Sequence, residues 1–253
     1  MSNKILFLGT GPVGGVSERG KTKRLETSAL IKTSEGNILI DASEDFNKQF
    51  KLIDKIDAIL ITHGHRDAIG GISQLRNSTN YQIPLHTLPG TIKHIKKKFR
   101  QLDFLEFHSL KSFKFFQLFD IKIVSFKVKH SIQKGFPTLG FKFYFSDGYK
   151  LTYISDTGGW NDKVQNLIFG SDLLILDGAM WGKKLISHLD IKEITSKAKK
   201  WGIKKLIFTQ IGRTAPPYEI LKKELRKIWP VSPSPGGPNV LSAYDGLEIL
   251  LKK

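Results

Sequence analysis

Short apolar runs rich in β-branched residues recur along the whole chain, with helical segments between and after them. So many strands need more than one sheet, which predicts an α/β or α+β class with two packed layers of strand. The predicted strands are 5–8, 28–31, 37–40, 58–62, 113–119, 121–128, 139–145, 150–154, 173–176, 205–209 and 246–251. The predicted helices are 45–52, 68–75, 91–99, 163–169, 191–201 and 217–229.

The sequence predicts one domain over residues 1–253, because no linker rich in Pro, Gly or Ser divides the chain. The nearest such stretch, SPSPGGP at 232–238, lies too close to the end to separate two domains. The apolar stretch in MSNKILFLGT is too short for a signal peptide. Because no apolar run approaches the roughly 18 residues of a membrane span, we expect a cytoplasmic protein without membrane contact.

The chain is strongly basic: 40 Lys and Arg against 23 Asp and Glu give a formal net charge of +17. Such a surplus often accompanies phosphate-rich partners, since positive potential concentrates anions near the surface. Here no tail or block carries the excess, and the densest stretch, KHIKKKFR at 93–100, has the pattern of the solvated face of a helix. A lysine-rich composition is the favoured interpretation, and nucleic acid stays an open alternative.

A GxGxxG pattern made by Gly9, Gly11 and Gly14 follows the first predicted strand. In a dinucleotide site this turn must open directly into a helix, whose N-terminus meets the pyrophosphate. Pro12 interrupts the pattern, and SERGKTK at 17–23 has no apolar helical stripe. We therefore predict a loop here and no Rossmann site.

The segment ITHGHRDAIGG at 61–71 carries the strongest chemical signal, directly after the apolar run DAILI. His63 and His65 follow a buried strand, so both imidazoles can reach one ion, and Asp67 can approach the same centre. The chain has no cysteine, so any metal site must be built from nitrogen and oxygen ligands.

With this motif the sequence resembles the metallo-β-lactamase superfamily, whose signature is HxHxDH followed by distant His, Asp and His ligands. By that resemblance His130 in VKHS is the third histidine, Asp156 in YISDTGG is the metal-bridging aspartate, and Asp41 in LIDAS is a structural aspartate of the site. The resemblance implies a four-layer αββα sandwich. It also implies a divalent metal held by His63, His65, His130 and Asp156.

The C-terminal third is similar to the branch that contains tRNase Z and the phosphoribosyl cyclic phosphodiesterase. The segments that carry this similarity are LDGAMWGKKLISHLDIKEI at 176–194, KKLIFTQIGRT at 204–214 and AYDGLEILL at 243–251. His188 then falls on the histidine that assists the leaving oxygen. The chain between His130 and Asp156 is short and no insertion for gripping tRNA is evident, so pre-tRNA processing is disfavoured.

Two expected histidines of the second metal are replaced, by Ala68 and by Gln210. Asp67, Asp156 and the Gln210 amide could still form an oxygen-rich second position, which would suit Mn²⁺ or Mg²⁺ better than Zn²⁺. One ion is favoured over two. Zinc is the preferred metal, with manganese and iron as alternatives.

These features predict a metal-dependent hydrolase, most of all a phosphodiesterase for a small or cyclic substrate, which uses a metal-bound hydroxide. Asp67 would orient the hydroxide, His188 would assist the departing alkoxide, and Arg213 is a candidate phosphate contact. A catalytically degenerate protein that binds a ligand or partner is one alternative, motivated by Ala68 and Gln210. An RNA-directed nuclease is another, and a homodimer is left open.

Overall fold

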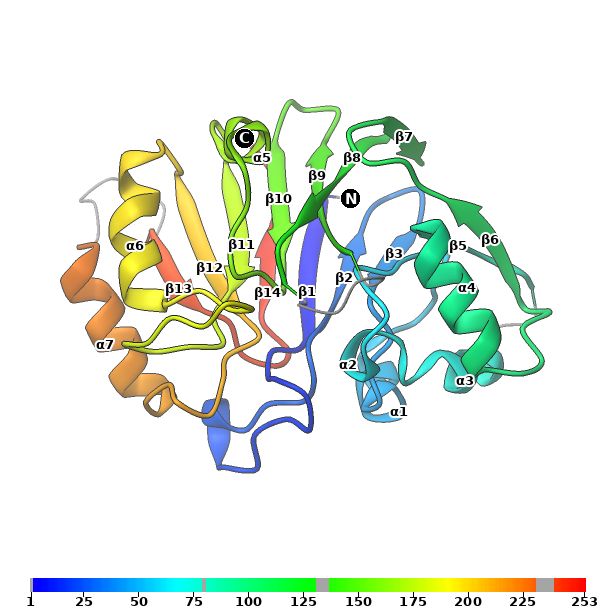
Figure 1. Ribbon diagram of the computed structural model, residues 1–253, viewed down its shortest axis with the longest axis horizontal. Helices are drawn as coiled ribbons and strands as arrows, with labels where there is room; N and C mark the ends of the chain where they lie inside the picture. The colour runs from blue at the N-terminus through cyan, green and yellow to red at the C-terminus, as the bar shows by residue number, and fades with distance from the viewer. Residues whose placement is uncertain (1, 79–80, 131–136, 231–238) are drawn as a thin grey trace.

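Two β-sheets form the centre of the computed structural model, which describes residues 2–78, 81–130, 137–230 and 239–253 (Figure 1). The first sheet has seven strands in the order β14-β1-β2-β3-β4-β5-β6. Its pairs from β14 to β3 are antiparallel, and those from β3 to β6 are parallel. Its strands are β1 (Lys4–Gly9), β2 (Ser28–Lys32), β3 (Asn37–Ile40), β4 (Ala58–Leu60), β5 (Ile83–Thr87), β6 (Leu105–Ser109) and β14 (Glu248–Leu250).

The second sheet repeats this mixture, with seven strands in the order β13-β12-β11-β10-β9-β8-β7. The pairs from β13 to β10 are parallel and the pairs from β10 to β7 are antiparallel. Its strands are β7 (Phe115–Leu118), β8 (Ile121–Val128), β9 (Thr138–Tyr144), β10 (Lys150–Ile154), β11 (Leu173–Asp177), β12 (Lys205–Thr209) and β13 (Val240–Ser242).

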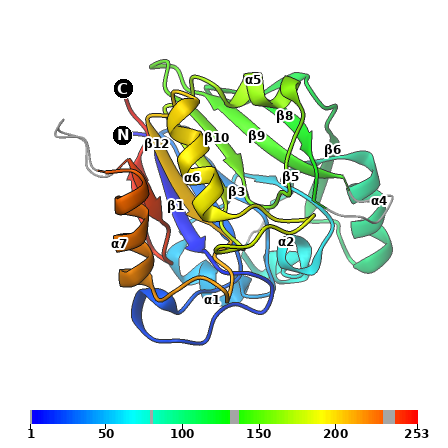
Figure 2. The ribbon, with the colours of Figure 1, turned by 60° about the vertical axis from the view of Figure 1, so that its left-hand side comes forward.

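Helices cover the outer face of each sheet, on opposite sides of the molecule in Figures 1 and 2. Those on the first sheet are α1 (Phe46–Gln49), α2 (Arg66–Ile69), α3 (Ile72–Leu75) and α4 (Pro89–Lys98). Those on the second sheet are α5 (Asp162–Ile168), α6 (Ile191–Lys200) and α7 (Tyr218–Ile228). Short 3₁₀ turns occur at η1 (Gly20–Thr22), η2 (Phe50–Leu52) and η3 (Arg76–Ser78). The predicted αββα sandwich is confirmed.

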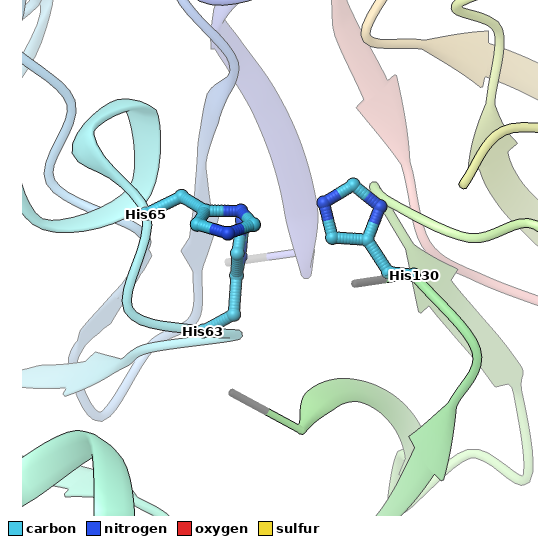
Figure 3. A group of neighbouring side chains, drawn as sticks. All are labelled: His63, His65 and His130. Carbon is cyan, nitrogen blue, oxygen red and sulfur yellow. The ribbon is translucent and has the colours of Figure 1, made fainter. Parts of the chain in front are cut away.

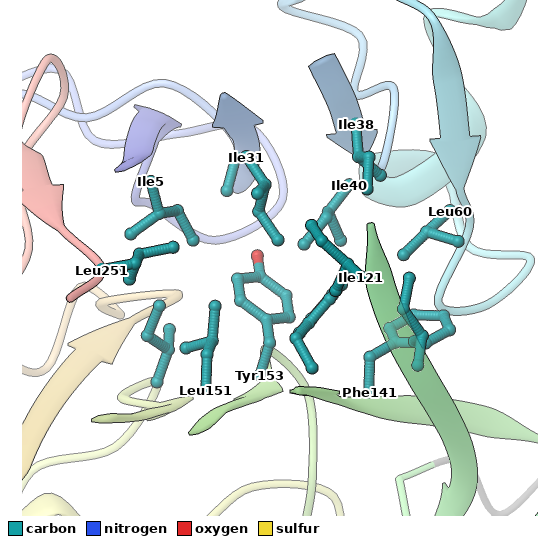
Figure 4. Close-up of a cluster of buried hydrophobic side chains, with 14 of the residues drawn as sticks. Ile5, Ile31, Ile38, Ile40, Leu60, Ile121, Phe141, Leu151, Tyr153 and Leu251 are labelled. Carbon is teal, nitrogen blue, oxygen red and sulfur yellow. The ribbon is translucent and has the colours of Figure 1, made fainter. Parts of the chain in front are cut away.

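The inner core lies between the two sheets (Figure 4). Ile31 and Ile40 of the first sheet face Phe141, Leu151 and Tyr153 of the second, and all five are fully buried. Two further apolar clusters lie between each sheet and its helices. Because both faces of a strand such as β11 are covered, its LLILD sequence is apolar almost throughout instead of alternating.

Three strands of the described residues were not predicted: β5, β6 and β13. In β5 the sequence IPLHT places Pro84 and His86 within the strand, and in β6 the sequence LEFHS is only partly buried, so neither reads as an apolar run. Strand β13 has only three residues. Tertiary pairing with β4 and β12 makes these segments strands despite their weak local pattern.

The helix predicted over 68–75 is two short helices, α2 and α3, separated at Gly70 and Gly71. A Cβ atom on Gly71 would lie 2.1 Å from the Ser43 carbonyl oxygen, so this close approach needs glycine. The GxGxxG segment is a loop, as predicted, since no helix opens after β1 until the 3₁₀ turn at Gly20. The segment 232–238 lies outside the described residues. Among the described helices, none is long and apolar enough to cross a membrane.

Candidate metal centre

The predicted metal ligands and Gln210 follow the ends of strands at one edge of the two sheets. His63 and His65 lie after β4, and His130 follows β8. Asp156 follows β10, and Gln210 follows β12. Strands β10, β11 and β12 are mutually parallel, and β8 runs in the same direction as β10, so their carboxyl ends meet at one edge. Figure 3 shows His63 and His65 on one loop and His130 facing them from another.

The three histidines converge on one point. Each offers a ring nitrogen, and these nitrogens all lie within 4.8 Å of one another. The ring centroids are 4.7 Å apart for His63 and His65, and 5.2 Å apart for His63 and His130. The rings are inclined by 87° and 80° in these two pairs, so they surround a shared space instead of stacking.

A hydrogen-bond relay fixes the orientation of His63. The backbone N–H and the hydroxyl of Thr62 donate to the two carboxylate oxygens of Asp41, each at 2.8 Å. The Thr62 oxygen also lies 2.8 Å from Nδ1 of His63. Because the Thr62 hydroxyl donates to Asp41, the proton on that contact belongs to His63 Nδ1, and Nε2 keeps its lone pair.

That lone pair has no partner among the described residues, because His63 Nε2 is buried without a hydrogen bond. Burial lowers the pKa of His63 to about 4, so the ring is neutral at pH 7. A neutral imidazole with an unused buried nitrogen is the form that binds a metal ion. The site therefore fits one divalent cation.

His130 is oriented in a similar way by the loop before α6. Its Nδ1 lies 3.0 Å from the Ser187 carbonyl oxygen, which can only accept, so Nδ1 carries the proton and Nε2 faces the site. The Nε2 atom is 4.0 Å from Oδ1 of Asp156. His130, Asp156 and His188 form a second group whose candidate ligand atoms also lie within 4.8 Å of one another.

The two predicted acidic residues, Asp67 and Asp156, both lie beside the histidines. Asp156 is 3% exposed; burial by itself raises the pKa of this carboxyl, but the charges of His63, His130 and His188 outweigh it and lower the pKa. Oδ1 of Asp67 lies 3.9 Å from Nε2 of His63. The arrangement brings two carboxylates and three imidazoles around one small space.

His188 forms a hydrogen bond with a buried aspartate that was not predicted. Its Nδ1 lies 2.8 Å from Oδ2 of Asp177, the last residue of β11. Burial lowers the pKa of His188, but the hydrogen bond and the negative charge of Asp177, with the charges of Asp156 and Asp67, raise it above its ordinary value overall. Asp177 is held in turn by the backbone N–H groups of Thr157 and Ala179.

These residues line an open pocket of about 730 Å³. Its walls are Pro12, Val13, His65, Arg66, Asp67, His130, Asp156, Ala179, Ser187, His188 and Gln210. Arg213 is not among them, because its Nη2 donates to the carbonyl oxygens of Val13 and Gly15, each at 2.9 Å. The guanidinium thus holds the loop that carries Val13, and its contact with a phosphate stays a prediction.

Ala68 and Gln210 stand where the resemblance places two histidines of a second metal, and neither presents a ligand atom between Asp67 and Asp156. Ala68 is buried and has no donor atom. The Gln210 amide nitrogen donates to Oδ2 of Asp67 at 3.1 Å and to Oδ1 of Asp156 at 2.8 Å. An N–H group that donates to both carboxylates offers no lone pair to a cation between them, so Gln210 is not a ligand in this orientation. A second metal ion stays a prediction.

Sequence reasoning missed Thr62, Asp177 and the Ser187 carbonyl. They orient His63, His188 and His130, in that order. Thr62 and Asp177 each lie directly at the end of a buried strand, in ITHGH and LDGAM, and that position was the available signal. The Ser187 contact joins residues 57 positions apart through a backbone oxygen, so no pattern of residue types reveals it.

Comparison with known proteins gives the family. A model of the beta-lactamase superfamily domain matches residues 36–211, which span the loop of His63 and His65 through Gln210. The chain belongs to the metallo-β-lactamase superfamily. A solved structure with a similar fold is described as a new diphosphatase from the PhnP family, with a TM-score of 0.82 and 25% identity. The alignment covers 98% of this chain and 97% of that one.

The fold is also similar to that of Zn²⁺-bound PqqB from Methylobacterium extorquens, with a TM-score of 0.80 at 18% identity, over 97% of this chain and 99% of that one. Among curated relatives, an octanoyltransferase of Porphyromonas gingivalis is 26% identical over 98% of this chain, which spans only 51% of that protein. Exodeoxyribonuclease YycJ of Bacillus anthracis is 26% identical over 72% of this chain and 66% of its own length. The chain therefore matches only about half to two thirds of the curated relatives' lengths.

Proposed function

We propose that this metallo-β-lactamase-fold hydrolase cleaves phosphodiester bonds in small or cyclic anionic substrates. The observation that carries the proposal is the convergence of three imidazoles beside a pocket that His188 also lines. A divalent ion bound by His63, His65 and His130 would acidify a water molecule and polarise the scissile bond. Such an ion also attracts the phosphoryl oxygens of a substrate.

The side chains of the chain itself would supply proton transfer and orientation. Asp67 lines the pocket beside His63 and can accept a proton from the attacking water. His188 keeps Nε2 available toward the pocket because Nδ1 is engaged by Asp177. Its raised pKa favours the protonated ring, which can donate to a departing alkoxide.

The substrate class rests on relatives and on charge. A diphosphatase and an exodeoxyribonuclease, by their descriptions, act on phosphorus esters or anhydrides. The net charge of +17 favours anionic substrates in general. We propose zinc as the ion, because a set with three nitrogen ligands suits Zn²⁺, with Mn²⁺ or iron as alternatives. The zinc-bound PqqB structure supports that choice.

Hydrolysis of bis(p-nitrophenyl) phosphate by purified protein with Zn²⁺ or Mn²⁺ tests this function. We expect turnover by the wild type and by His94→Ala, whose imidazole lies on α4 and does not line the pocket, and loss of turnover in His63→Ala. Equal activity of wild type and His63→Ala contradicts the proposal. No activity with either metal favours the alternative of a protein that binds a ligand without turnover.

A nuclease is the second candidate, supported by the similarity to the exodeoxyribonucleases and by the positive charge. Contacts with several phosphates make binding fall steeply with salt. Binding of single-stranded RNA and DNA, measured at two salt concentrations and followed by cleavage assays, tests this alternative. Absence of binding at low salt removes it.

A further inference from the structure

Gln210 lies where a second cation would have to sit between two carboxylates. It follows β12, is 3% exposed and has a left-handed backbone with φ of 55°. Its amide nitrogen donates to Asp67 on one side and to Asp156 on the other. Both hydrogen atoms of the –NH₂ group are therefore used on carboxylate oxygens.

The orientation of this amide follows from charge. A reversed amide would place Oε1 against the oxygens of Asp67 and Asp156, which repel it when both carboxyls are ionised. In the observed orientation Oε1 points away and is buried without a hydrogen bond among the described residues. The structure thus leaves one polar atom unsatisfied in order to keep two donors on the carboxylates.

The neighbouring position gives no ligand that could compensate. Ala68 is 1% exposed and packs in the apolar cluster beneath α1–α3, with Ile69 and Ile72. A cation placed between Asp67 and Asp156 would meet carboxylate oxygens that already accept from Gln210. The imidazole of His188 lies near Asp156, but its Nδ1 is engaged by Asp177. The donors of Gln210 supply to these carboxylates the partial positive charge that the cation would otherwise supply.

We propose that the Gln210 amide takes the place of the second metal ion, so that the protein is a one-metal hydrolase in which Gln210 positions Asp67 and Asp156. This inference rests on the proposed metal centre of His63, His65 and His130. The inference deepens the proposed function. Gln210, by donating to the carboxylate of the general base Asp67, stabilises its negative charge as a second cation would. Gln210 touches neither substrate nor ion in this account, so it is a positioning residue.

Counting ions per chain tests the inference without any activity measurement. Metal-free protein is equilibrated with excess Zn²⁺ or Mn²⁺, washed, and analysed by elemental analysis and native mass spectrometry. We expect one ion in the wild type and two in the double variant Ala68→His/Gln210→His, which restores both missing imidazoles. Two tightly held ions in the wild type overturn the inference. The wild-type count stands on its own if the double variant does not fold.

The positioning role has its own test. Gln210→Met keeps the length of the side chain and removes both donors, so Asp67 and Asp156 lose their shared partner. By resemblance Asp156 is the fourth ligand beside the three histidines. We therefore expect the affinity for the single ion to fall about 10- to 100-fold, as when other metal ligands lose a hydrogen-bond partner. The matched control Gln165→Met, on α5 and outside the pocket, should keep the wild-type affinity. Unchanged affinity in Gln210→Met overturns the positioning role.

These outcomes separate the inference from the function on which it rests. One bound ion without hydrolysis of any phosphodiester leaves the role of Gln210 intact and contradicts the proposed activity. Hydrolysis with two bound ions does the reverse. A wild type that binds no ion overturns both.

Discussion

Nδ1 of His188 and Oδ2 of Asp177 are 2.8 Å apart, and the carboxylate that makes this contact is fully buried at the end of β11. The pair has the geometry of an oriented general acid: one ring nitrogen is fixed by a charged acceptor, and the other faces the pocket. Burial raises the pKa of Asp177, and its hydrogen bond to His188 opposes that rise. The buried carboxylate of Asp177 therefore fixes the ring of His188 at the pocket.

Asp177→Asn should lower kcat for bis(p-nitrophenyl) phosphate by about 100-fold, at the low end of what a general acid or base contributes. Without the carboxylate charge, burial dominates and lowers the pKa of His188, so the basic limb of the pH profile should move to lower pH. The bound metal, measured on the same sample, should not change. The control Asp147→Asn, in the exposed turn between β9 and β10, should be fully active. Full activity of Asp177→Asn would contradict the role of Asp177 in orienting His188.

Asp41→Asn should weaken metal binding about 10- to 100-fold, because it disturbs the relay that sets the tautomer of His63. Asparagine tolerates the left-handed backbone at this position, where φ is 62°. Its amide can satisfy only one of the two Thr62 donors, so the hydroxyl is free to donate to His63 Nδ1, which moves the proton to Nε2. Titration of metal-free protein with Zn²⁺ measures the affinity, and an unchanged value speaks against the relay.

The stability of the protein should depend on His86 at mildly acidic pH. Its ring stacks between His108, at 4.5 Å, and Phe116, at 5.6 Å, and burial, with the charge of His108, lowers its pKa to about 4. In the unfolded chain His86 has the ordinary histidine pKa of about 6.5. Between about pH 6.5 and 4 the unfolded chain therefore binds more protons at His86 than the folded chain does. The free energy of unfolding falls as pH falls through that window.

From pH 7 to pH 5 the wild type should lose about 1–2 kcal/mol more than His86→Phe, which keeps the stacking and cannot be protonated. Urea unfolding at the two pH values measures both proteins. The same pH dependence in the two would show that His86 is protonated equally in the folded and unfolded chains.

Gly71→Ala should destabilise the fold by about 1–3 kcal/mol, as other overpacking substitutions do. The added methyl group would lie 2.1 Å from the Ser43 carbonyl oxygen and 2.7 Å from Cβ of Phe46, so the backbone at Ser43 would have to shift. The urea midpoint should fall, whereas Ser73→Ala, at an exposed position of α3, should leave it within error. A wild-type midpoint in Gly71→Ala would show that the α2–α3 junction relaxes freely.

Much of the fold can be predicted from the sequence, because most strands of a sheet buried on both faces are continuous apolar runs. The apolar pattern does not reveal strands that contain polar residues and are held in the sheet by pairing with neighbouring strands. In β5 and β6, His86 and His108 stack across the parallel pair, so their polar side chains are tolerated inside the strands. The helix over 68–75 has the right periodicity, but only the close contact of Gly71 with Ser43 reveals its break.

The candidate metal site could be placed from residue types and spacing, because two imidazoles separated by one residue after a buried strand can both reach a single ion. The hydrogen bonds that orient the histidines of the site could not be predicted. Thr62 and Asp177 act through hydrogen bonds that depend on which strand ends are neighbours. The sequence predicts Gln210 as a possible ligand through its amide oxygen. In the structure its amide lies against Asp67 and Asp156, and because carboxylates accept, the nitrogen is the end that faces them.

Calorimetric titration of metal-free protein with Zn²⁺ tests the metal centre most directly. We predict tight binding to the wild type and to His94→Ala. The affinity of His65→Ala for Zn²⁺ should fall by more than about 100-fold. Loss of a hydrogen-bond partner of a ligand costs roughly 10- to 100-fold, and loss of the ligand itself should cost more. Equal binding by all three proteins, or no binding to the wild type, would contradict the claim that His63, His65 and His130 hold a divalent cation.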